Sequence, residues 1–173
     1  MSKKQKAKAI NYEILSRKDC PASYEMLADI TDKHHEHLSE AKIALAWRKT
    51  TNSDADGKLL LGRCKKCSDL EREAHGFDFI IVLNKEFWHD KETTDAKRRA
   101  LLDHEVTHAQ VSRDEEGEEK RDEFGRKVYR IRKHDIEEFR EIVERHGLWK
   151  GDLEAFARSC REKRAAPLLA EKP

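Results

Sequence analysis

The residues Phe77–Leu83 form the most apolar stretch of the chain, and they constrain the fold more than any other segment. The stretch is rich in β-branched and aromatic residues, which is typical of a central β-strand covered on both faces. After it the period changes, because the apolar residues between 100 and 109 recur at spacings of three and four. Thr93 or Thr94 can cap the helix that this spacing indicates. The sequence therefore predicts a buried strand followed by an amphipathic helix.

The remaining segments alternate between helical and extended patterns. Helices are expected near residues 21–37, 136–146 and 151–163. A period of two predicts a strand at 43–47, and the turn-forming residues 51–57 predict a hairpin between it and the apolar run Leu59–Leu61. This order of elements is typical of an α+β domain in which a small β-sheet packs against helices.

Composition limits the number of cores and the classes of protein. The chain carries 36 Lys and Arg against 35 Asp and Glu, which excludes a uniformly basic nucleic-acid coat protein and an acidic solvating protein. A hydrophobic share of 37% can fill one modest core, so we expect one domain over 11–163 between a basic tail at 1–10 and a C-terminal tail at 164–173. A mean hydropathy of -0.95, without an apolar run near the roughly 20 residues of a membrane span, predicts an intracellular, cytoplasmic protein.

The segment His104-Glu105-Val106-Thr107-His108 has the form H-E-x-x-H and lies within the helix that the apolar spacing predicts. Residues four apart in a helix point the same way, so both imidazoles can bind one metal ion. Glu105 then projects about 100° round the helix, beside an open coordination position. The alternative is a pair of surface histidines on an amphipathic helix. The apolar residues on the opposite side of the helix favour the metal site.

A catalytic zinc usually takes three protein ligands and keeps one position for water. The candidates for the third ligand follow the motif: His134, Asp135, Glu137, Glu138 and His146. Asp135 and Glu138 have the spacing of a capping box at the start of the next helix, and His146 is expected to pack or cap near its end. We therefore favour His134, with Asp135 and Glu138 as the alternatives.

Two further clusters of potential metal ligands have simpler explanations. Cys64 and Cys67 have the spacing of half a zinc site or of a redox pair, but the second close pair that a cysteine-only zinc site needs is missing. We expect reduced thiols there. His34, His35 and His37 would point in different directions on a helix, so solvated side chains are expected.

Five stretches together resemble the putative phage metallopeptidase family. They are Asp78–Asn84, Phe87–Trp88, Ala100–His108, His134–Phe139 and Glu144–Gly147. The resemblance covers nearly all of the chain between about residues 10 and 160. More distantly, the order of a strand, an H-E-x-x-H helix and a histidine before the next helix is similar to that of SprT-like zinc metallopeptidases.

The resemblance implies a zincin-like zinc metallopeptidase encoded by a phage or prophage. The zinc ligands that it implies are His104, His108 and His134. Glu105 would be the general base. In the SprT-like pattern an aromatic residue follows the third histidine by four positions, whereas Phe139 follows His134 by five. Aligning on the aromatic residue would place Asp135 at the ligand position, so Asp135 stays the alternative.

A zinc ion at this site would activate water for peptide-bond hydrolysis, with Glu105 accepting the proton and a protein or peptide as the substrate. The alternative is a metal-stabilised binding or adaptor module without proteolytic activity. The SprT-like resemblance also implies DNA-associated substrates, and weak nucleic-acid contacts could come from two basic groups: Lys3, Lys4, Lys6 and Lys8, and Arg126, Lys127, Arg130, Arg132 and Lys133. We favour pairing of the second group with the acidic residues of 113–123 in a solvated hairpin.

Overall fold

The computed structural model describes residues 11–50, 57 and 59–165. The chain divides into two compact units, Met1–Arg132 and Lys133–Pro173. Because this division does not test whether the units fold independently, the single domain over 11–163 stays a prediction. The basic tail at 1–10 and most of the expected C-terminal tail lie outside the described residues.

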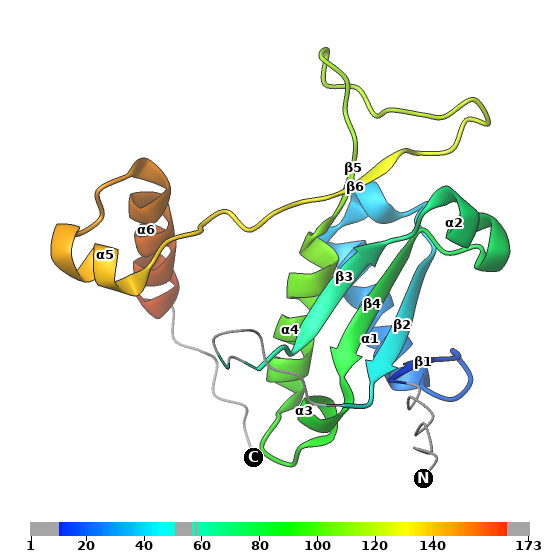
Figure 1. Ribbon diagram of the computed structural model, residues 1–173, viewed down its shortest axis with the longest axis horizontal. Coiled ribbons are helices and arrows are strands. Elements are labelled where there is room, and N and C mark those ends of the chain that lie inside the picture. Colours follow the sequence, from blue (N-terminus) through cyan, green and yellow to red (C-terminus); the bar gives the residue numbers. More distant parts are fainter. Residues whose placement is uncertain (1–10, 51–56, 58, 166–173) are drawn as a thin grey trace, which may run out of the picture. The chain divides into compact units, whose positions relative to one another are not determined.

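The first unit is built around a four-stranded sheet with the strand order β1-β2-β4-β3 (Figure 1). β1 (Tyr12–Ile14) runs antiparallel to β2 (Ile43–Arg48), which runs parallel to β4 (Phe79–Asn84). β3 (Gly62–Lys66) pairs antiparallel with the other side of β4. The most apolar stretch of the sequence therefore occupies an inner strand, as predicted, and the α+β class is confirmed.

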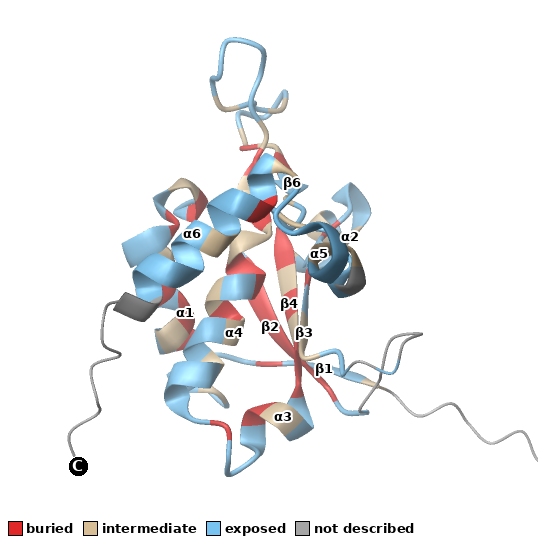
Figure 2. Cartoon of the chain, turned by 90° about the vertical axis from the view of Figure 1, so that its left-hand side faces the viewer, coloured by how far each residue is buried: buried red, intermediate tan, exposed pale blue. Residues whose placement is uncertain are grey.

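Two helices, α1 (Pro21–His34) and α4 (Asp95–Thr107), lie on one face of the sheet (Figure 2). The core between them is formed by residues that are almost fully buried: Leu27, Ile30, Leu45, Phe79, Ile81, Leu83, Leu102 and Val106. Thr94 caps α4, since its hydroxyl accepts a hydrogen bond of 3.3 Å from the Lys97 amide. The short helices of this unit are η1 (Glu36–Leu38), α2 (Asp69–His75) and α3 (Lys85–His89). The apolar side of α4 packs into this core, and this packing holds the H-E-x-x-H segment in place.

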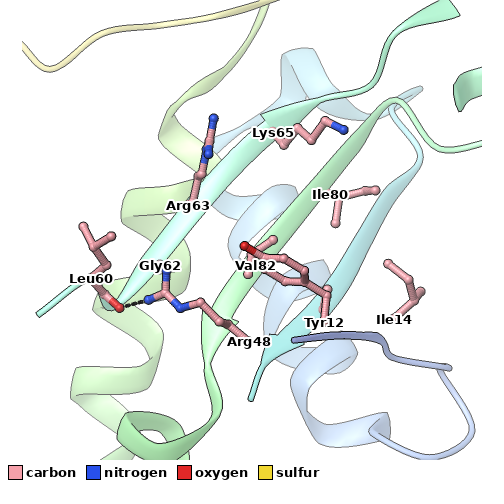
Figure 3. Close-up of a pocket in the computed structure, with 10 residues that line it drawn as sticks. Tyr12, Ile14, Arg48, Leu60, Gly62, Arg63, Lys65, Ile80 and Val82 are labelled. Atoms are coloured by element: carbon pink, nitrogen blue, oxygen red, sulfur yellow. Dashed lines mark hydrogen bonds between the residues drawn. The ribbon is translucent and has the colours of Figure 1, made fainter. Parts of the chain in front are cut away.

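The second face of the sheet is more open than the sequence predicts. Ile80 and Val82 of β4 are only half-buried, so the expectation of a strand covered on both faces was wrong. With Tyr12 and Arg48 they line a hollow of about 790 Å³ (Figure 3). The run of apolar residues in β4 reflects one tightly packed face and one partly exposed face.

The expected hairpin between 43–47 and Leu59–Leu61 was also wrong. β2 and β3 do not pair with each other, because β4 lies between them. The strand that follows the turn is Gly62–Lys66, a polar segment at the sheet edge with only Cys64 buried. An edge strand tolerates polar side chains, which is why its sequence lacks the apolar signal of a strand. Residues 51–56 of the predicted turn lie outside the described residues.

A charged hairpin extends from the two-stranded sheet of β5 (Ala109–Val111) and β6 (Tyr129–Ile131). Its basic residues pair with acids, as for Lys127 with Glu119 at 2.9 Å and Arg126 with Asp122 at 2.7 Å. For these two cations, pairing within the hairpin matches the favoured expectation.

The second unit contains α5 (Arg140–His146) and α6 (Gly151–Ala165). α5 begins later than predicted, with Phe139 as its N-cap and no side-chain cap, so the capping box of Asp135 and Glu138 was wrong. Glu138 instead accepts hydrogen bonds from the Phe139 amide and from Trp149 Nε1.

None of the helices in the described residues combines the length and apolarity of a membrane span.

Candidate metal centre

The two histidines of the H-E-x-x-H segment lie at the C-terminal end of α4. His104 is in the last turn, and His108 is the C-cap residue. Because His108 keeps helical dihedral angles, φ -68° and ψ -25°, the spacing of one helical turn persists to the end of the motif. The two rings are 5.0 Å apart between centroids and stand at 85° to each other. The helix therefore presents both imidazoles on one side.

The His108 ring is oriented by the chain that follows β6. Its Nδ1 lies 2.7 Å from the carbonyl oxygen of Arg132, and the Arg132 amide donates to the His108 carbonyl at 2.7 Å. A carbonyl oxygen only accepts, so Nδ1 carries the proton and the neutral ring has its lone pair on Nε2. A backbone carbonyl that fixes the tautomer in this way is the usual second partner of a metal-binding histidine.

His134 follows Arg132 by two residues, so the exchange of hydrogen bonds between Arg132 and His108 brings it to the end of α4. The potential ligand nitrogens of His104, His108 and His134 all lie within 4.8 Å of one another. Nitrogen ligands of one tetrahedral zinc stand about 3.3 Å apart at bond lengths of 2.0–2.1 Å, so a ring movement of about 1 Å would close the set. The three imidazoles therefore fit a divalent metal ion.

Glu105 lies on the sheet side of the motif and is 4% exposed. Burial raises the pKa of its carboxyl group, while the nearby His108 and a backbone hydrogen bond with Cys64 act in the opposite direction. A carboxylate with a raised pKa is a better proton acceptor near neutral pH. Its position beside the two histidines suits a general base.

The sequence matches the family described as putative phage metallopeptidase over residues 16–161. The chain belongs to this family. No curated protein and no solved structure matches the chain. Membership in a metallopeptidase family and the three-histidine cluster together indicate a metal-binding protein of the peptidase class.

The other candidates for a third ligand in this family member are not part of the three-histidine cluster. Asp135 and Glu137 do not belong to the cluster, and both are exposed. The Glu138 carboxylate bonds Trp149 and lies 3.4 Å from Lys150 Nζ. His146 is exposed in the last turn of α5, so the packing role was wrong, while a role near the end of the helix stays a prediction. Of the five candidates, His134 is the one that shares a cluster with His104 and His108, and its role as a ligand stays a prediction.

The histidines near the end of α1 differ from the expectation of a solvated cluster. His34 is exposed, but His35 is 6% exposed and its Nε2 lies 2.7 Å from Asp103 Oδ1 on α4. His37 is half-buried, with Nε2 3.3 Å from the Ala109 carbonyl. These contacts join segments about 70 residues apart, and no local sequence signal indicates them.

Cys64 and Cys67 are both buried and form no disulfide, and their role stays a prediction. Within the described part of the chain, the three histidines form the one cluster of potential metal ligands, and neither cysteine belongs to it.

Proposed function

We propose that the protein is a zinc-dependent metallopeptidase of a phage or prophage that hydrolyses peptide bonds in a protein or peptide substrate inside the host cell. The observation that carries this proposal is the convergence of His104, His108 and His134 within 4.8 Å, with Glu105 beside them. Family membership over residues 16–161 supports the same activity class.

The donor set favours zinc. Three neutral imidazoles suit a divalent ion of intermediate softness, and a set of three protein ligands keeps a coordination position open for chemistry. When bound, zinc supplies a Lewis acid that activates water and polarises the scissile carbonyl. Within the described residues no fourth ligand joins the cluster, which supports an open rather than a closed site.

Glu105 performs the proton transfer in this proposal. Its carboxylate accepts a proton from the attacking water, and it then donates that proton to the amine that leaves. The raised pKa of this buried carboxyl group supports both directions of transfer. Hydrolysis needs no covalent intermediate with the protein.

Replacement of Glu105 by Gln tests the mechanism. Glu105→Gln keeps the size of the side chain but removes the proton acceptor, so hydrolysis of a fluorogenic casein should fall by about 10²–10⁴-fold. Its zinc content, measured by elemental mass spectrometry, should stay near that of the parent. Glu25→Gln on the exposed side of α1 is the matched control and should keep full activity. An active Glu105→Gln protein would reject the mechanism.

The ligand set is tested on the same preparations. His104→Ala and His134→Ala should both lose zinc together with hydrolysis. Retention of zinc in His134→Ala would move the third ligand to Asp135 or Glu138. Stoichiometric zinc in a parent protein that hydrolyses no substrate would favour the binding or adaptor module.

A further inference from the structure

Glu105 packs against a glycine of the neighbouring strand more closely than any other residue type would allow. A Cβ atom built on Gly62 would lie 2.4 Å from Glu105 Oε1, 2.8 Å from Cδ and 2.9 Å from Cγ. Contacts below 3.0 Å are essentially never made by real Cβ atoms. Gly62 is not among the glycines with positive φ, so the missing side chain, and not the backbone conformation, is what this position requires.

Both partners of this contact are held in place. Gly62 pairs with Leu83 of β4, whose side chain is fully buried. On the other side, Leu102 and Val106 fix α4 through their fully buried side chains. Figure 3 shows Gly62 on β3, in front of α4. Neither backbone can retreat without disturbing the core, so an added side chain would have to displace the Glu105 carboxylate.

The same strand also provides a partner for that carboxylate. The backbone of Cys64, two residues beyond Gly62, forms a hydrogen bond with Glu105. A carboxylate that is 4% exposed needs such a donor, because an unpartnered charge is costly to bury. Strand β3 therefore gives Glu105 space at Gly62 and a donor at Cys64.

We propose that Gly62 is a positioning residue for Glu105, and that β3 holds the carboxylate in the orientation from which it accepts the proton. The catalytic part of this inference rests on the proposed function. The contact itself does not, because it is a packing relation between β3 and α4. The two parts are tested by separate measurements.

The contact is tested by a thermodynamic cycle on the full chain, with urea denaturation of the parent, Gly62→Ala, Glu105→Ala and the double variant. Gly62→Ala should lower the denaturation midpoint of the parent. In the Glu105→Ala background the same change should lower it much less, because the Cγ, Cδ and Oε1 atoms that would collide are gone. If Gly62→Ala alone fails to fold, the double variant should restore folding. Equal shifts in both backgrounds, or a double variant that stays unfolded, would overturn the contact.

The positioning role is tested by kinetics. Gly62→Ala should lower kcat at least tenfold, with KM and zinc content within twofold of the parent. Gly151→Ala is the matched control, because a Cβ there meets no atom within 4 Å. An unchanged kcat in Gly62→Ala would overturn the role. A parent without hydrolysis would reject the proposed function and the catalytic role together, while the cycle would still decide the contact.

Discussion

At the scale of single residues, Cys64 gives a pH dependence with a definite sign. Burial, together with the charge of Glu105, raises the pKa of its thiol from 9.0 to about 12. Above pH 9 the unfolded chain therefore releases this proton while the folded protein keeps it. The contribution of the neutral thiol to the free energy of unfolding is therefore fully present below pH 9, and it is lost as the pH rises towards 12.

Replacement of Cys64 by Ala isolates this effect. Between pH 10 and 11, where the thiol of the unfolded chain is almost fully ionised, the parent should lose roughly 1.4 kcal/mol of unfolding free energy per pH unit that the Cys64→Ala variant does not lose. Urea denaturation of both proteins at pH 8, 10 and 11 in a reductant measures this difference, and the contributions of the other titrating groups cancel between the two proteins. A difference between the two proteins that does not change with pH would show that the thiol ionises alike in both states.

At the scale of elements, the sequence predicts those whose apolar residues form a continuous run or recur with a regular period. β2, β4 and α4 were found in this way, and so was the pair of histidines that one helical turn brings together. β3 was missed because an edge strand with one buried residue has no apolar period. The contact of Gly62 with Glu105 could not be predicted either, since it depends on the packing of β3 against α4. From the residues alone, and apart from the family resemblance, His134 could be chosen only by excluding the other candidates, because its approach depends on the hydrogen bonds between Arg132 and His108.

The pair of His35 and Asp103 joins the end of α1 to the helix of the metal site. Because His35 is buried and its partner is a carboxylate, His35→Ala should lower the unfolding free energy by about 2 kcal/mol through the lost hydrogen bond and packing. His34→Ala, which changes an exposed neighbour, should stay within about 0.5 kcal/mol of the parent. Urea denaturation compares the two variants, and similar losses in both would argue against a stabilising role of this pair.

At the scale of the whole molecule, the hydrophobic core and the metal site are separate. The core consists of buried side chains between the sheet and its helices, whereas His104 and His134 are exposed and His108 is half-buried. A structural zinc site is closed and contributes directly to folding. An open site on the surface of a domain that already has its own hydrophobic core need not contribute to folding. The first unit is therefore expected to keep its fold when the metal is removed.

Chelation distinguishes these two kinds of site. Dialysis of the zinc-loaded protein against EDTA should abolish hydrolysis while the far-UV circular dichroism and a cooperative thermal transition persist. The Tm should fall by a few degrees, because EDTA removes the stabilisation RT ln(1 + [L]/Kd) that an ion bound only to the folded state contributes. His104→Ala serves as the control and should show no response to EDTA. Loss of the cooperative transition in the parent would mean that the metal completes the fold, which is the behaviour of a metal-stabilised binding module and not of an enzyme with an open coordination position.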